Sequence, residues 1–232
     1  MTKYHILGET NDPEIHDVPQ TVPSQSLFLK SLAYLFSVLF HPLLIPMYVT
    51  LFLIYLHPSY FAGFGKSEKI QVLLIVLLNV IFFPLFTVFL LKGLGLIDSL
   101  YLKSQKDRII PYIASSIFFF WACRVFLQQP QYPLIIGAFM LGVLLASFIA
   151  LFANIYYKIS MHGIGMGGLL GILTEIMKSH TMLMTWPFCI SILLTGIVCS
   201  SRLLLSDHIQ KEIYTGLLVG FICQLIAGLI LV

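Results

Sequence analysis

The sequence predicts an all-α protein, a polytopic transmembrane helical bundle of about six to seven spans. Of its 232 residues, 59% are hydrophobic and 10% are charged, and the mean hydropathy is +0.96. A soluble domain carries about 25% charged residues. The apolar runs are also continuous, without the alternation of a membrane β-strand. These observations exclude a water-soluble enzyme and a disordered chain, and the scattered net charge of +3 does not indicate a nucleic-acid partner.

Residues 1–27 are predicted to form a flexible polar tail, which is followed by a single membrane domain over residues 28–232. The tail contains Pro13, Pro19 and Pro23 and shows no apolar periodicity. It lacks the basic start and the apolar stretch of about 7–15 residues that are typical of a secretory signal. We therefore expect no cleavable signal.

The predicted spans are runs long enough to cross a hydrocarbon core about 30 Å thick, which takes about twenty helical residues. Five runs contain no Lys, Arg, Asp or Glu, and two more carry ionisable residues near their ends. The seven runs are Ser31 to Leu56, Ile70 to Leu91, Ile109 to Leu127, Pro133 to Tyr157, Ile159 to Lys178, Thr181 to Ser200 and Ile213 to Val232. In the first run, Pro42 and Pro46 could instead produce two half-helices.

Several residues are predicted to have structural roles only. Gly163, Gly167 and Gly171 recur every four residues, which favours close approach to a neighbouring helix in a membrane. Glu175 is predicted to pair with Lys178 three residues later and to lie in solvent at one surface. Structural roles are also assigned to the histidines that have no obvious partner in the sequence, namely His41, His57 and His180.

Ionisable residues gather in three clusters, at residues 103–111, 158–163 and 201–212. Two spans separate each cluster from the next, and an even number of crossings returns the chain to the same membrane face. The three clusters are therefore expected to form one pocket. The cationic side chains of these clusters favour an anionic ligand, and a phosphate can accept hydrogen bonds from Arg and Lys. The candidate phosphate ligands are Lys103, Lys106, Arg108, Lys158, Ser160 and Arg202.

The third cluster also predicts an activated nucleophile. If the last helix begins near Ser206, His208 and Glu212 lie one turn apart on the same face. The carboxylate can then hold one imidazole nitrogen and leave the other free to attack. His162, from the second cluster, is the candidate general acid.

The three clusters resemble the signature motifs of the type 2 phosphatidic acid phosphatase (PAP2) superfamily, as a divergent membrane branch. The third motif, Ser-Arg, five residues, His, three residues, Asp, is matched with Glu in place of Asp. The matching residues are Ser201, Arg202, His208 and Glu212.

The second and first motifs match this chain less closely. The second motif, Pro-Ser-Gly-His, is matched at Ser160 and His162, while Ile159 and Met161 replace Pro and Gly. The first motif, Lys, six residues, Arg-Pro, is matched at Arg108. The position seven residues earlier is Tyr101, the nearby basic residues are Lys103 and Lys106, and Pro111 comes two residues late.

The resemblance implies a membrane phosphatase that acts on a lipid phosphate or lipid pyrophosphate through a phosphohistidine, with no metal or other cofactor. His208 would be the nucleophile, Glu212 its orienting carboxylate, and His162 the acid. The protein is expected to be integral to the membrane, which in a bacterium would be the cytoplasmic (inner) membrane. Its partners would be the lipid substrate and the bilayer. Positive residues near several spans are also candidate phosphate ligands, so the positive-inside rule leaves open which side the site faces.

Two alternatives remain open at this stage. The same residues could transfer the phosphoryl group to another alcohol instead of to water. In a second reading, the chain is a non-catalytic lipid-binding scaffold or a small transporter with a degraded site, because broken helices such as the one that Pro42 and Pro46 suggest are common in transporters. The lipid and the oligomeric state are not determined by the sequence.

Overall fold

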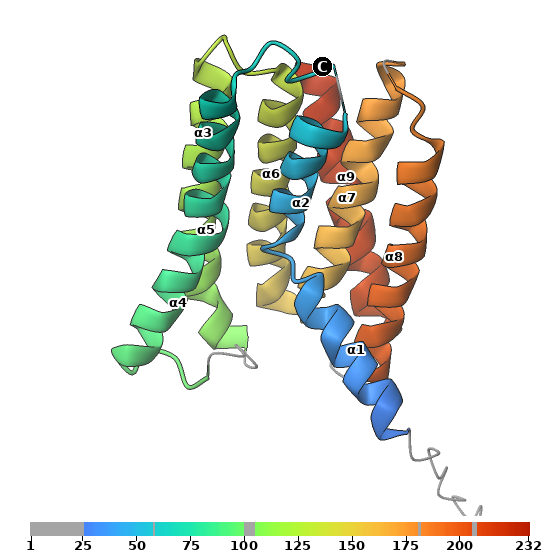
Figure 1. Ribbon diagram of the computed structural model, residues 1–232. Coiled ribbons are helices and arrows are strands. Elements are labelled where there is room, and N and C mark those ends of the chain that lie inside the picture. The colour runs from blue at the N-terminus through green and yellow to red at the C-terminus, as the bar shows by residue number, and fades with distance from the viewer. Residues whose placement is uncertain (1–25, 58, 100–104, 181, 206–207) are drawn as a thin grey trace, which may run out of the picture.

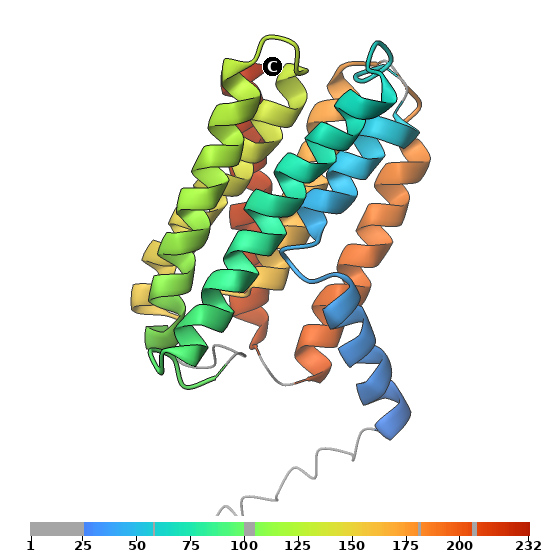
Figure 2. The ribbon, with the colours of Figure 1, turned by 60° about the vertical axis from the view of Figure 1, so that its left-hand side comes forward.

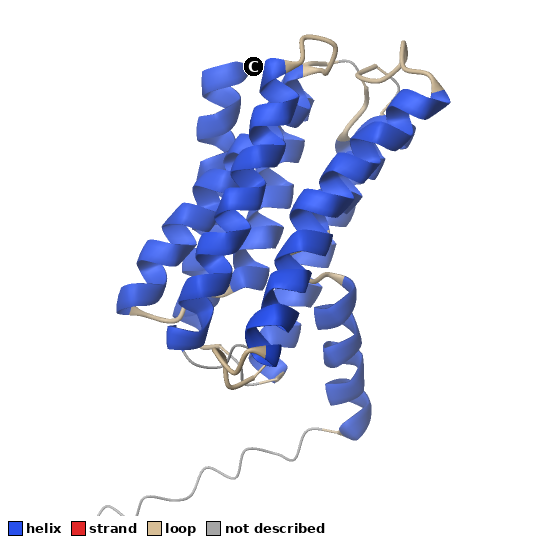
Figure 3. Cartoon of the chain, turned by 90° about the vertical axis from the view of Figure 1, so that its left-hand side faces the viewer, coloured by secondary structure: helices blue, strands red, loops and turns tan. Residues whose placement is uncertain are grey.

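The computed structural model describes residues 26–57, 59–99, 105–180, 182–205 and 208–232, and all regular structure in these ranges is helical (Figure 3). The predicted tail lies outside the described residues up to residue 25. The elements are α1 (Leu27–Leu39), α2 (Ile45–Leu51) continuing as the π-helix η1 (Phe52–Leu56), α3 (Lys66–Val76) continuing through the π-helix η2 (Leu77–Phe82) into α4 (Phe83–Gly93), α5 (Gln105–Gln128), α6 (Leu134–Tyr156), α7 (Met161–Lys178), α8 (Thr185–Leu204) and α9 (Gln210–Leu231).

Five helices are long and apolar enough to cross a membrane: the continuous helix Lys66–Gly93, α5, α6, α8 and α9. The protein is therefore integral to a membrane, as predicted. Of the six to seven predicted spans, five are confirmed. The other predicted spans differ from these five. The helix α7 has 18 residues and carries Glu175 and Lys178, and the first predicted span is broken into two shorter helices.

The run from Ser31 to Leu56 is not one helix. The helix α1 ends at Leu39 and α2 begins at Ile45, so the half-helix alternative is correct. Proline disfavours helical geometry at the preceding residue and lacks an N–H, which explains a break at His41 and Pro42. Pro46 lies in the first turn of α2, where a missing N–H costs nothing. In Figure 1, α1 lies at the lower end of the bundle beside α8 and α2 lies in the upper half.

The helices α7 and α9 pack with their backbones in contact. A Cβ on Gly163 would lie 2.7 Å from the Ile213 carbonyl oxygen, and one on Gly216 would lie 2.6 Å from the Ser160 carbonyl oxygen. Gly167 and Gly220 are still more tightly enclosed, by the backbones of Leu217 and Ile164. The predicted glycine seam is therefore confirmed, and α9 contributes glycines of its own. This packing places the N-termini of the two helices side by side.

Glu175 differs from its prediction in one respect. Its pair with Lys178 is present, with 2.7 Å between Nζ and Oε1, but Glu175 is only 3% exposed and does not lie in solvent. The carboxylate lies against Gly228 of α9, where a Cβ would come within 2.5 Å of it. The missing side chain on α9 makes room for the buried carboxylate. Lys178, which is exposed, supplies its compensating charge.

The alternating direction of the helices brings the three ionisable clusters to one end of the bundle. The N-termini of α5, α7 and α9 and the C-termini of α6 and α8 all lie at the lower end in Figures 1 and 2. This arrangement follows the parity of crossings expected from the sequence. We call this end of the bundle the polar end.

Candidate active site

A cavity of about 930 Å³ lies at the polar end and receives side chains from all three clusters. Arg108 comes from the first turn of α5, and Lys158 from the connection between α6 and α7. His162 comes from the first turn of α7, Arg202 from the last turn of α8, and His208 from the connection between α8 and α9. Residues from distant parts of the sequence thus surround one space large enough for a phosphorylated ligand.

His208 and Glu212 form the hydrogen-bonded pair that the sequence predicts. The distance between His208 Nδ1 and Glu212 Oε2 is 2.7 Å, and both side chains are largely buried. The helix α9 begins at Gln210, later than expected, so His208 precedes the helix while Glu212 lies in its first turn. A carboxylate oxygen accepts, so Nδ1 carries the hydrogen and Nε2 keeps its lone pair.

The surroundings of His208 favour its neutral form. Burial lowers the pKa of His208, and the charges of Lys158 and Arg202 lower it further. The hydrogen bond and charge of Glu212 act in the opposite direction without reversing the shift. At neutral pH the imidazole is therefore neutral, which a nucleophile requires.

His162 is held by a residue of α1. Its Nε2 lies 2.9 Å from the Ser37 carbonyl oxygen and 3.2 Å from the Ser37 Oγ. A carbonyl oxygen can only accept, so Nε2 carries a hydrogen. The Ser37 Oγ also accepts a hydrogen bond of 2.6 Å from Nη1 of Arg202. One serine from the first half-helix thus links the candidate acid to a candidate phosphate ligand.

The second and third clusters are also joined through the backbone. Ser160 N–H donates to the Glu212 carbonyl oxygen at 3.2 Å. The Ser160 hydroxyl accepts from Gly163 N–H at 3.3 Å and caps α7. Ser160 is fully buried and is not among the residues that line the cavity, so its hydroxyl positions the start of α7. This differs from the phosphate contact expected of it.

The first cluster is only partly placed in the cavity. Arg108 lines it and interacts with the Tyr112 hydroxyl one turn later. Lys106 is exposed and is not among the lining residues. Lys103 lies outside the described residues. Of the first cluster, Arg108 is therefore the candidate ligand that the structure brings to the cavity.

His41 and Ser37 line the same cavity and were missed in the sequence. The His41 ring lies edge-on to the His162 ring, with 5.7 Å between centroids, although 121 positions separate the two residues. His41 therefore has a partner that the sequence did not indicate, and its structural role stays a prediction, as does that of buried His57, which stacks on Tyr60. The His-Pro pair predicted a break in the helix. Nothing in the sequence connected that break to the three clusters.

The cavity continues from its polar mouth toward the middle of the bundle. Gln224 of α9 lines this deeper part, is 2% exposed, and donates from Nε2 to the Phe139 carbonyl oxygen at 3.1 Å. Ser147 of α6 also lines it and shares a 2.7 Å hydrogen bond with Ser116 of α5. The cavity thus extends well beyond the space that one phosphate fills.

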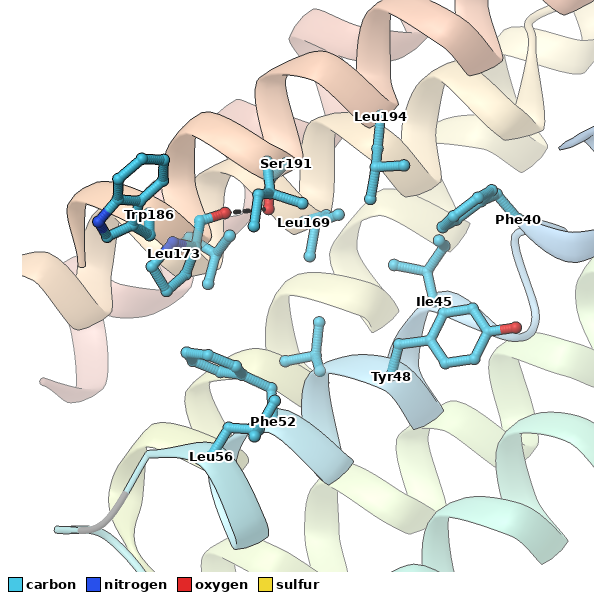
Figure 4. A pocket seen from close by; sticks show the side chains of 13 residues that line it. Phe40, Ile45, Tyr48, Phe52, Leu56, Leu169, Leu173, Trp186, Ser191 and Leu194 are labelled. Carbon is cyan, nitrogen blue, oxygen red and sulfur yellow. Dashed lines mark hydrogen bonds between the residues drawn. The ribbon is translucent and has the colours of Figure 1, made fainter.

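A second, apolar groove of about 340 Å³ lies beside this cavity (Figure 4). It runs between the helix formed by α2 and η1 on one side and α7 and α8 on the other, with Phe40 at one end and Trp186 near the other. Ile45 lines both the groove and the polar cavity. The Ser191 hydroxyl in the groove is bonded to the Pro187 carbonyl oxygen of its own helix at 2.8 Å, so the groove wall is essentially hydrocarbon.

No family model, curated protein or solved structure matches this chain.

Proposed function

We propose that this protein is a membrane phosphatase that cleaves a lipid phosphate or lipid pyrophosphate through a phosphohistidine, without a metal. One observation carries the proposal. The hydrogen-bonded pair of His208 and Glu212 lies at a cavity that His162 and three cations also line. A nucleophile, its orienting carboxylate, a proton donor and phosphate ligands are the groups that metal-independent phosphoryl transfer requires.

The cations would bind the phosphoryl oxygens. Arg108 and Arg202 can each offer a fork of N–H donors to two oxygens, while Lys158 supplies a point charge beside His208. Negative charge on the transferring group increases or shifts between oxygens during the reaction. Fixed donors in a partly dehydrated cavity stabilise that change more than water does.

The chemistry would proceed in two steps. His208 Nε2 attacks phosphorus, the bond from phosphorus to the leaving oxygen breaks, and His162 gives that oxygen its proton. Burial and the charge of Arg202 lower the pKa of His162 to about 3 when no anion is bound, so His162 takes up this proton when the phosphate anion binds. Water then attacks the phosphohistidine while His162 accepts a proton from it, and the bond from phosphorus to Nε2 breaks to release phosphate. An acceptor alcohol in place of water would give the phosphotransferase variant by the same groups.

The apolar groove supports a lipid as the substrate. A hydrocarbon chain could lie between α2 and α8 while its phosphate occupies the polar cavity, because Ile45 borders both spaces. Ligand sites of this kind combine an apolar wall with a few polar groups at one end. A soluble phosphate ester would gain nothing from the groove.

Phosphate release by the purified protein in detergent, with a chelator present, tests the proposal. The substrates are a panel of lipid phosphates and lipid diphosphates. We expect release by the native chain, a loss of roughly a thousand-fold or more in His208→Ala, and a loss of about 10²–10⁴-fold in His162→Ala.

His180→Asn is the matched control. His180 is an exposed histidine after α7, at the opposite end from the cavity, with a φ of 51° that Asn tolerates. This variant should keep full activity. Release that survives His208→Ala, or no release from any lipid, would contradict the proposal.

The second candidate is a lipid-binding scaffold or small transporter. It is favoured by the broken first segment and by a cavity that continues to Gln224. Such a protein would bind lipid phosphates without releasing phosphate, and its binding would not require the Nε2 lone pair of His208. The same panel, read for binding as well as release, separates the two candidates.

A further inference from the structure

The connection between α1 and α2 brings to the cavity a third imidazole that the mechanism above does not use. We propose that His41 contacts the leaving group, and that this contact selects lipid diphosphates over lipid monophosphates. The inference rests on the proposed function and narrows it to one substrate class. It follows from the contact of His41 with His162 and from the hydrogen that His41 presents.

His41 lies next to His162, the candidate general acid. The two rings pack edge-on, with 5.7 Å between their centroids, and both line the cavity. If His208 attacks phosphorus from one side, the leaving group departs on the other side, toward His162. His41 packs against His162, so the rest of the leaving group would lie within reach of its ring.

The connection holds His41 in one tautomer. The His41 Nδ1 accepts a hydrogen bond of 3.3 Å from Leu43 N–H, so the hydrogen of the neutral ring is on Nε2. Two backbone hydrogen bonds stabilise the turn: His41 N–H to the Val38 carbonyl oxygen at 3.2 Å and Leu44 N–H to the His41 carbonyl oxygen at 2.8 Å. The ring therefore presents an Nε2–H donor at the cavity.

A diphosphate provides an acceptor for this donor, and a monophosphate does not. When a lipid diphosphate is cleaved, the leaving group is the lipid monophosphate, whose non-bridging oxygens gain charge as the bond breaks. A fixed N–H donor stabilises such charge. When a lipid monophosphate such as farnesyl monophosphate is cleaved, the leaving group is an alcohol whose single oxygen takes its proton from His162. The leaving group then has no further oxygen for His41 to bond.

The test compares two probes with the same hydrocarbon chain, farnesyl diphosphate and farnesyl monophosphate. We expect the native chain to have the higher kcat/KM on the diphosphate. His41→Ala should lower the diphosphate value by about a hundred-fold and change the monophosphate value by no more than about two- to three-fold. His41→Gln, whose amide can donate from a similar position, should recover part of the diphosphate activity. His180→Asn serves as the control.

Several results would overturn the proposal. If His41→Ala lowers kcat/KM equally on both probes, His41 only positions His162. If it lowers kcat/KM on neither probe, His41 has no role in the reaction. A native chain that prefers the monophosphate would assign the opposite substrate class.

A binding measurement separates this inference from the proposed function. If no variant releases phosphate from either probe, the proposed function fails. The affinities of both probes for His208→Ala and for His208→Ala combined with His41→Ala then still show whether His41 contacts the diphosphate. A diphosphate preference that disappears in the double variant supports the contact. Equal affinities for the two probes overturn it.

Discussion

The two sides of the candidate active site are held in place by different forces. On one side, α7 and α9 touch along their backbones through glycines, and this contact places His162 near the pair of His208 and Glu212. On the other side, α1 is an apolar helix with most of its residues exposed, and it reaches the site through the hydrogen bonds of Ser37. The first side has almost no freedom to move, whereas the second depends on a few polar contacts. Substitutions on the α7 and α9 side should therefore lower stability, whereas substitutions on the α1 side should change substrate binding.

The largest effect is expected at the helix contact. In Gly220→Ala, the new Cβ would collide with the backbone of Ile164, and main chain cannot yield as a flexible side chain can. We expect a loss of stability of about 1–3 kcal/mol or more, seen as a lower Tm in detergent, together with loss of phosphate release. Gly196→Ala in α8 is the matched control, because a Cβ there meets nothing within 4 Å. A Gly220→Ala chain with native Tm and activity would show that this contact does not hold the site.

A smaller effect is expected on the α1 side. Ser37→Ala removes the hydroxyl that accepts from Arg202 but keeps the carbonyl that accepts from His162. Because Arg202 loses one orienting bond, we expect KM for the lipid substrate to rise about ten-fold, as for a lost hydrogen bond to a charged group, with Tm unchanged. Ser31→Ala, on the same helix with its hydroxyl bonded to Leu27, is the control. A fall in Tm without a change in KM would mean that Ser37 serves packing alone.

The smallest effect is a shift of the acid limb of the pH profile. His208 must be neutral to attack, and its lowered pKa puts the loss of kcat/KM below pH 6.5. Lys158 lowers that pKa, so Lys158→Gln should move the acid limb to higher pH. Glu212 raises it, so Glu212→Gln should move the limb to lower pH while also reducing kcat. Shifts in the same direction for both variants would contradict the assignment of His208 as the nucleophile.

Much of the α7 and α9 side could be predicted from the sequence, because the relevant spacings are local. Glu212 lies four positions after His208, and Gly167 lies four positions after Gly163, so each spacing corresponds to about one helical turn. The parity of crossings then indicated that three distant clusters share one end. The burial of Glu175 could not be foreseen, since it depends on a missing side chain at Gly228 of another helix.

The contribution of α1 and of the break after it had no such local signal. The prolines at positions 42 and 46 indicated a break, but the direction in which α1 leaves the break is set by its packing on α8. That direction carries Ser37 and His41 to His162, more than a hundred residues away. Lys106 likewise lies outside the cavity, although its charge had made it a candidate ligand.

By itself, the sequence determined that this protein is helical and integral to a membrane, that three clusters of ionisable residues lie at one end, and that a carboxylate four positions away pairs with His208. These properties depend on composition and on short spacings, which chain connectivity enforces. Only the tertiary structure decided which residues complete the cavity, because contacts between helices distant in sequence depend on how closely their backbones approach and on where a broken helix turns. The glycine contacts between α7 and α9 determine how closely those backbones approach, and the packing of α1 on α8 determines where the broken helix turns.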